Sequence, residues 1–214
     1  MQTNGSDTGL SDGLIAALPL RRRGASRARI LAATRQLLSR QSYDALTMDA
    51  VADAARLTRR TIYHQFVGRQ SLYRASREAL AHGVGRALPT TIPVAEPERT
   101  TLLHFAADTL RALSTPEGTE LLLSLLRDTE ERGWVAALYD RHCRSITCNA
   151  VSRWLLATGR GHHPQAVAQF SALIEALALA PCLATPGPMP PTDRRAMLQP
   201  VVDSFLAMFD KGYR

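Results

Sequence analysis

Residues 58–61 form a short run of hydroxyl and guanidinium side chains: Thr58, Arg59, Arg60 and Thr61. An arginine can donate two hydrogen bonds to the O6 and N7 atoms of guanine, and a threonine can contact a phosphate or the methyl group of thymine. These groups reach base edges only from the exposed start of a helix that enters the major groove. The neighbouring elements must therefore present this run at the beginning of a short, well-supported helix.

The sequence around this run predicts two short helices joined by a tight turn. They span Thr47–Ala55 and Thr58–Gln65, and each begins with a threonine, a typical N-cap residue. Ile62 and Phe66 point to the side opposite the exposed residues, where they can pack on the other helices. Two short helices in this arrangement are typical of a helix-turn-helix, whose second helix reads DNA.

A longer helix is predicted on each side of this pair. The first begins with Ser26 as its N-cap, and the second begins near Arg69 and ends before Pro89. Residues 90–97 contain two prolines and are predicted to be a linker. Only helical periodicity follows, in segments at about residues 98–113, 133–158, 164–180 and 192–211. The chain is therefore predicted to be all-α.

Basic charge is concentrated in the same part of the chain. The 214 residues include 26 lysines and arginines against 19 aspartates and glutamates, a net charge of +7. Residues 21–74 hold twelve arginines and three aspartates, a surplus of nine, whereas residues 75–214 hold fourteen residues of each sign. A basic segment on a neutral body indicates a polyanion as partner, most simply nucleic acid. A solvated arginine-rich face and a membrane surface are the alternatives.

The segments Thr47–Ala55, Leu57–Phe66 and Arg69–Leu72 resemble the DNA-binding domain of the tetracycline-repressor (TetR) family of bacterial regulators. The family pattern has a threonine before a helix that ends in two alanines, then a turn, a Ser or Thr, a basic residue, a tyrosine and a phenylalanine. The resemblance covers about residues 26–80. Arg56 and Ser42 depart from it, because the family usually has glycine at both positions.

The resemblance implies that eight residues bind double-stranded operator DNA. Those that contact phosphates are Thr47, Tyr63, His64 and Arg69. Those that cap the recognition helix or approach base edges are Thr58, Arg59, Arg60 and Thr61. Phe66 is interpreted as a core aromatic residue.

The resemblance also implies a three-helix DNA-binding domain joined to a helical ligand-binding and dimerisation domain. We expect a mobile tail over residues 1–24, the helix-turn-helix domain over 25–68 and the regulatory domain over 69–214. The tail ends in the cluster Arg21–Arg23, which either lies on DNA or has no role. The last two long helices are expected to pair with their copies in a homodimer, because an operator with two half-sites requires two-fold symmetry.

A small-molecule effector is expected to bind inside the regulatory domain. The residues predicted to line its cavity are aromatic, aliphatic and imidazole side chains at helical spacing, with core packing as the alternative for each: Tyr73, His104, Phe105, Trp134, Leu138, His142, Phe170 and Ile174. A cavity of this composition would suit an apolar or aromatic molecule.

The sequence gives little support for a metal site, a disulfide, a catalytic site or a membrane-spanning segment. Cys143, Cys148 and Cys182 have no metal-ligand spacing and no disulfide pattern, so we expect no cofactor and no metal. Neither Gly-x-Ser-x-Gly nor His-Glu-x-x-His occurs, so we expect no catalytic residues and no enzyme. No secretion signal is found, and we expect no run to reach the ~18 apolar residues that a membrane-spanning helix needs. A cytoplasmic protein is therefore expected.

These features predict a ligand-responsive, sequence-specific transcriptional regulator, with repression as the expected sign and a palindromic operator as the target. An architectural protein that coats DNA without sequence preference is the first alternative, since it would use the same arginines without a cavity. A helical enzyme with an incidental basic segment is the second alternative. A sharp operator sequence or a bound small molecule would exclude the first alternative, and turnover without DNA binding would favour the second.

Overall fold

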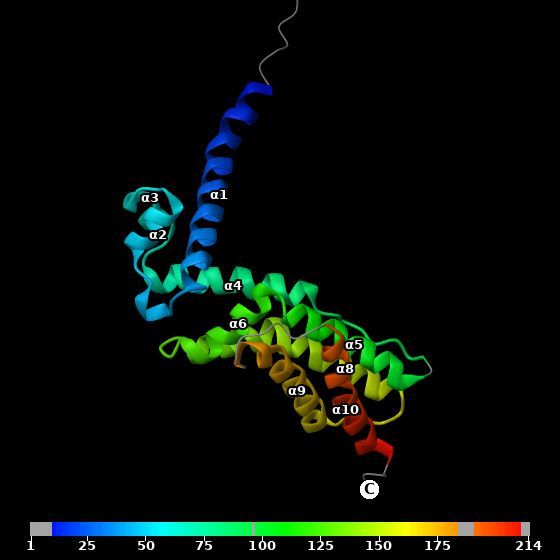
Figure 1. Ribbon diagram of the computed structural model, residues 1–214. Helices are drawn as coiled ribbons and strands as arrows, with labels where there is room; N and C mark the ends of the chain where they lie inside the picture. The colour runs from blue at the N-terminus through cyan, green and yellow to red at the C-terminus, as the bar shows by residue number, and fades with distance from the viewer. Residues whose placement is uncertain (1–9, 96, 184–190, 211–214) are drawn as a thin grey trace, which may run out of the picture. The chain divides into compact units, whose positions relative to one another are not determined.

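A computed structural model describes residues 10–95, 97–183 and 191–210, with side chains described for 24–95, 97–182 and 196–209. All regular elements within these ranges are helical, which confirms the predicted all-α class (Figure 1). Two compact units divide the chain, Met1–Ser76 and Arg77–Arg214. The division falls inside helix α4, eight residues beyond the domain boundary predicted at residues 68/69.

The first unit contains three complete helices, a short 3-10 turn and the start of α4. In chain order these elements are α1 (Leu10–Leu38), η1 (Tyr43–Ala45), α2 (Met48–Ala55), α3 (Arg59–Gln65) and α4 (Arg69–Ala87). Its core consists of fully buried aliphatic side chains from every helix: Ile30, Leu38, Leu46, Val51, Ile62 and Leu72. Phe66 is also buried, as predicted. This core supports α2 and α3 from behind and leaves the start of α3 exposed.

Helix α1 begins much earlier than the sequence predicted. It starts at Leu10, so Ser26 lies inside the helix and does not cap it. Leucine, alanine and arginine make up most of residues 14–23, and all three are favourable in helices. The predicted tail therefore overlaps α1 over residues 10–24. Residues 1–9 and the side chains of Arg21–Arg23 lie outside the described part of the chain.

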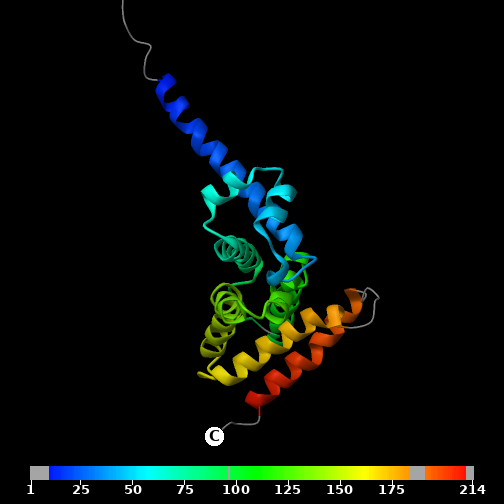
Figure 2. The same ribbon diagram turned by 90° about the vertical axis from the view of Figure 1, so that its left-hand side faces the viewer.

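The second unit continues α4 and adds six further α-helices and a π-helical segment. In chain order these are α5 (Glu98–Leu113), α6 (Pro116–Arg127), α7 (Arg132–Tyr139), the π-helical segment (Asp140–Arg144), α8 (Ser145–Ala157), α9 (Pro164–Leu183) and α10 (Pro191–Asp210). The predicted helices over residues 98–113 and 164–180 are confirmed. Helices α9 and α10 lie side by side (Figure 2). The predicted proline-rich connection falls mostly on residues 184–190, outside the described residues.

The long helix predicted over residues 133–158 is interrupted by the π-helical segment. There the chain passes closely against α4, and the Cys143 thiol lies 3.9 Å from the carbonyl oxygen of Ala81. On the other side, Arg144 donates two hydrogen bonds to Glu175 of α9, at 3.0 and 2.6 Å. A π-helical turn inserts one residue into an α-helix. Hydrophobic spacing cannot reveal it, because the contacts that stabilise it come from distant parts of the sequence.

The close approach of the π-helical segment predicts opposite effects for two glycines of α4. A Cβ atom added to the buried Gly85 would overlap the carbonyl oxygen of His142, whereas one added to the exposed Gly83 meets nothing within 4 Å. Gly85→Ala is therefore expected to lower the free energy of unfolding by about 1–3 kcal/mol, the usual cost of overpacking. Gly83→Ala is expected to raise it by up to about 1 kcal/mol, because alanine is the better helix former. Urea unfolding of both variants measures this difference; equal free energies would contradict the close contact.

Helix α9 corrects one expectation about membranes. Pro164–Cys182 is long and apolar enough to cross one, with a mean hydropathy of 1.3, but only by length and composition. One third of this stretch is buried within the chain. Glu175 is the only charged residue of α9, and it turns inward to Arg144. The rest of this helix thus presents an uncharged, largely apolar surface, and a second protein surface can cover it as well as a lipid can.

Candidate nucleic-acid interface

The two threonines predicted as N-caps both act as caps. The Thr47 hydroxyl accepts a hydrogen bond from the backbone N–H of Ala50 at 3.1 Å, and that of Thr58 accepts one from Thr61 at 3.2 Å. The hydroxyl groups of Thr58 and Thr61 also lie 2.9 Å apart, within hydrogen-bond distance. Each cap satisfies a backbone donor that the first turn leaves unpaired. Helix α3 therefore begins at a fixed position although it is only seven residues long.

The turn between α2 and α3 is left-handed at Arg56, where the TetR pattern has glycine. Arg56 has φ 51° and ψ 48°, a conformation that costs a non-glycine residue about 1 kcal/mol. The Arg29 guanidinium of α1 donates hydrogen bonds to the carbonyl oxygens of Ala55, at 2.7 Å, and Arg56, at 3.3 Å. These bonds fasten the turn to α1. The departure at Arg56 thus leaves the helix-turn-helix geometry intact.

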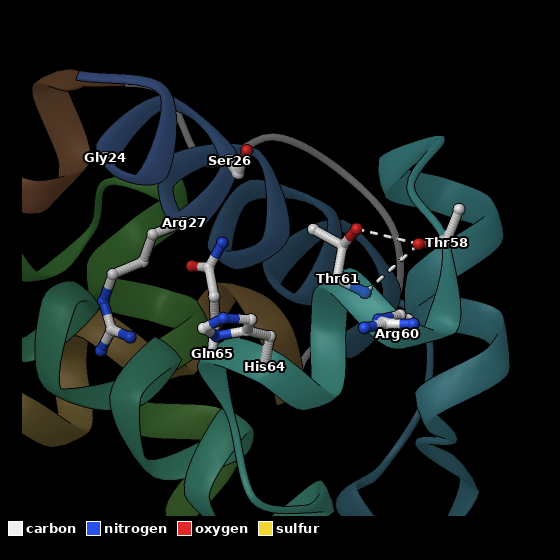
Figure 3. Close-up of a pocket in the computed structure, with 8 residues that line it drawn as sticks. All are labelled: Gly24, Ser26, Arg27, Thr58, Arg60, Thr61, His64 and Gln65. Carbon is white, nitrogen blue, oxygen red and sulfur yellow. Dashed lines mark hydrogen bonds between the residues drawn. The ribbon is translucent and has the colours of Figure 1, made fainter. Parts of the chain in front are cut away.

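The two arginines at the start of α3 have different surroundings. Arg59 forms an exposed ion pair with Asp49 of α2. No ion pair or hydrogen bond is recorded for the Arg60 side chain among the described residues, and this side chain lines a hollow beside α1 together with Thr61 and His64 (Figure 3). An exposed ion pair is worth at most about 1 kcal/mol, so Arg59 can exchange Asp49 for another partner. Arg60 needs no such exchange and is the better placed of the two to bind a base.

Tyr63, His64 and Arg69 lie on the exposed side of this unit or at its edge. Tyr63 exposes 51 % of its surface, which is unusual for so large an apolar ring. Arg69 is held more firmly, since it donates to the carbonyl oxygen of Asp44 at 3.0 Å and stacks over the Tyr43 ring at 4.3 Å. The phosphate roles expected for these residues remain predictions.

The exposure of Tyr63 gives its hydroxyl group a testable role. If this group donates a hydrogen bond to a phosphate, Tyr63→Phe should lower DNA affinity by about 0.5–1.5 kcal/mol per half-site with no change in sequence preference, because a phosphate carries no sequence information. Operator titrations and a repeated selection from random DNA measure the two effects separately. A changed consensus sequence would instead place Tyr63 against a base.

A comparison with models of known protein families tests whether this helix pair matches a known DNA-binding domain. Residues 30–76 match the family model described as bacterial regulatory proteins, tetR family. Residues 30–76 are thus similar to the DNA-binding domain of TetR-family regulators. The match spans α2, α3 and most of the first unit, and it includes all eight residues predicted to contact DNA. None of the curated proteins matches the sequence significantly.

Solved structures of TetR-type regulators share the fold over most of the chain. The flavonoid-responsive regulator FrrA is 18 % identical with a TM-score of 0.68, and the alignment covers 86 % of this chain and 97 % of FrrA. A TetR-family regulator from Pseudomonas syringae pv. tomato is 18 % identical with a TM-score of 0.67, covering 85 % and 95 % of the two chains. NalD of Pseudomonas aeruginosa, the secondary repressor of the MexAB-OprM multidrug efflux pump, is 18 % identical with a TM-score of 0.58, covering 85 % and 96 %. At these identities the likeness establishes the fold.

The structure places the residues predicted to line an effector cavity in different surroundings, and their role stays a prediction. Phe105, Leu138, Phe170 and Ile174 are buried in the core of the second unit. His104 is exposed, and Trp134 and His142 are half-buried. Tyr73 belongs to the first unit, where its buried ring packs edge-to-face on Tyr43 with the ring centroids 4.7 Å apart. Helical spacing predicted inward-facing positions, but it could not separate core packing from a cavity wall.

The cysteines are free thiols. Burial and, to a smaller extent, the negative charge of Glu175 together raise the pKa of the Cys143 thiol to about 12. This thiol therefore stays protonated and unreactive near neutral pH. No group of three or more potential metal ligands occurs within the described part of the chain.

Two hollows stand out on the surface. One, of about 560 Å³, lies between α1 and α3 within the first unit; its lining residues are Gly24, Ser26, Arg27, Thr58, Arg60, Thr61, His64 and Gln65. The other, of about 390 Å³, is a largely apolar hollow between α9 and α10; its lining residues are Gln169, Phe170, Ala172, Leu173, Val201, Ser204, Phe205 and Met208. Sequence reasoning missed Arg27 and Gln65. The only signal for Arg27 was the basic composition of residues 21–74, because its place beside α3 depends on how α1 and α3 pack together.

Proposed function

We propose that this protein is a homodimeric transcriptional regulator that binds a palindromic DNA operator and releases it when a small apolar or aromatic effector binds. Repression is the proposed sign, and the bacterial cytoplasm, where operator DNA lies, is the proposed location. The observation that carries the proposal is the capped start of α3, which exposes Arg60 and Thr61 while Ile62 and Phe66 anchor the helix in the core.

The proposed DNA contacts follow from this geometry. Arg60 and Thr61 stand at the N-terminal end of α3, the part of a recognition helix that meets base edges. Thr47, Tyr63, His64 and Arg69 surround it with groups that bind phosphates. Thr58 and Arg59 complete the set as the cap of the helix and as a second arginine that can leave Asp49.

The dimer is proposed to form through α9 and α10. Their shared surface carries the hollow of about 390 Å³, and Leu173 exposes 49 % of its surface there. Because α9 has one charged residue and that residue pairs inward, a second copy can cover this face without burying an unpaired charge. Two-fold symmetry then presents two α3 helices to half-sites about 34–36 Å apart.

The proposed class of effector rests on what two structural neighbours respond to or repress, and on the apolar residues predicted to line the cavity. One structural neighbour responds to flavonoids, and another represses a multidrug efflux pump. Phe105, Leu138, Phe170 and Ile174 provide an apolar interior, and an effector reaches them if the core opens. Such a molecule would stabilise a state whose two α3 helices no longer match the operator, and so shift the population off DNA.

Selection of random duplex DNA by the purified protein tests the function. At about 150 mM salt the proposal expects an inverted repeat whose half-sites lie one helical turn apart. Weak enrichment with a steep dependence on salt would favour an architectural DNA-binding protein. Absence of binding would overturn the regulator and leave the helical enzyme as the alternative to test.

A further inference from the structure

We propose that the hollow between α1 and α3 receives the sugar–phosphate backbone of operator DNA, and that Arg27 of α1 binds a phosphate there. This inference rests on the proposed DNA binding and adds α1 to the interface. None of the eight residues predicted to contact DNA lies on α1.

The lining of the hollow suits a polyanionic strand. Seven of its eight residues carry polar side chains, and none of them carries a carboxylate. Two are arginines from opposite walls: Arg27 comes from α1 and Arg60 from α3 (Figure 3). The hollow is open to solvent, and the DNA backbone runs beside a recognition helix that lies in the major groove.

The Arg27 side chain is held in place by the core of the same unit. Its guanidinium carbon lies 4.5 Å from the centroid of the Phe66 ring, and Phe66 is buried. Stacking on an aromatic ring orients a guanidinium but leaves its N–H donors available. No carboxylate partner of Arg27 is recorded among the described residues. A phosphate can therefore bind Arg27 without displacing an existing ion pair.

The other described arginines of α1 serve as internal comparisons. Arg29 donates to the carbonyl oxygens of the α2–α3 turn, so its role is structural. Arg35 is exposed and does not line the hollow. Removing Arg35 changes the net charge by the same amount as removing Arg27, which makes Arg35 the matched control.

The test measures operator affinity of the full-length protein against salt concentration. Arg27→Gln should weaken binding about tenfold at about 150 mM salt, and should reduce the slope of log K against log salt by about one per subunit. The preferred sequence should stay the same, because a phosphate contact carries no base information. Arg35→Gln should change both quantities much less. Arg27→Lys should keep the salt slope, which a merely structural role for Arg27 would not predict.

Gly24 allows a second test that removes no contact. A Cβ atom at Gly24 meets nothing within 4 Å, so both alanine and glutamate fit there, and both favour a helix. Gly24→Glu places a carboxylate at the hollow and should weaken binding several-fold, whereas Gly24→Ala should leave it unchanged. Thermal unfolding checks that all variants are folded.

The outcomes separate the two proposals. If the wild-type protein selects an operator but Arg27→Gln behaves like Arg35→Gln, the α1 contact is wrong and the regulator stands. A change in the preferred base sequence on replacing Arg27 would also overturn it. If the wild-type protein does not bind DNA, both proposals fall.

Discussion

Arg60→Ala is expected to lower operator affinity by about 1–3 kcal/mol per half-site and to relax the preference at one base position. Arg60 stands in the first turn of α3, and no partner of its side chain is recorded within the described residues. A bidentate contact with guanine would account for both effects, because alanine removes the donors that distinguish guanine from the other bases. The proposed symmetric dimer would carry the change twice, so the loss on the full operator is expected to exceed tenfold.

Arg59→Ala is the informative comparison for this prediction. This substitution removes the same charge from the neighbouring position, but the guanidinium of Arg59 already pairs with Asp49. We expect a smaller loss of affinity, with little change in base preference. Titrations at one salt concentration give the affinities, and repeated selection with each variant gives the preferences. Unchanged preference in Arg60→Ala, together with a relaxed position in Arg59→Ala, would reverse the assignment of the base-reading residue.

The helix-turn-helix could be predicted because its signals are local. A threonine side chain caps a helix through a residue three positions later, and Ile62 and Phe66 follow the spacing of one buried helix face. The structure confirms both caps and both core positions. The expectation of DNA binding came from the resemblance to the TetR family. Capping and periodicity alone do not distinguish a DNA-reading helix from any other short helix.

The remaining features depend on contacts between distant parts of the chain. The π-helical segment is placed by Gly85 of α4 and by Glu175 of α9. Arg27 lies beside the hollow because α1 and α3 both border it, which no local pattern encodes. The effector residues illustrate the same limit: inward-facing positions are predictable, but whether a buried face packs tightly or encloses a ligand depends on all the side chains that meet there.

The second large effect is expected at the surface shared by α9 and α10. Leu173→Glu should convert the proposed dimer to a monomer, because the substitution removes an apolar contact from both copies and buries two unpaired carboxylates across the symmetry axis. A central interface residue contributes about 2 kcal/mol or more, and an unpaired buried charge adds several kcal/mol. Sedimentation or light scattering over a range of protein concentrations measures the change in mass.

The affinity for the operator should fall when the dimer dissociates. Two linked half-site contacts strengthen each other by about 10²–10⁴-fold, so the monomer should lose affinity by a factor in this range while it keeps the salt dependence of a single half-site. Leu156→Glu is the matched control: Leu156 of α8 exposes 56 % of its surface, close to the 49 % of Leu173, but does not line the α9–α10 hollow. A Leu173→Glu protein that stays dimeric would move the interface elsewhere. One that becomes monomeric yet binds the full operator as tightly as before would show that the two α3 helices do not act together.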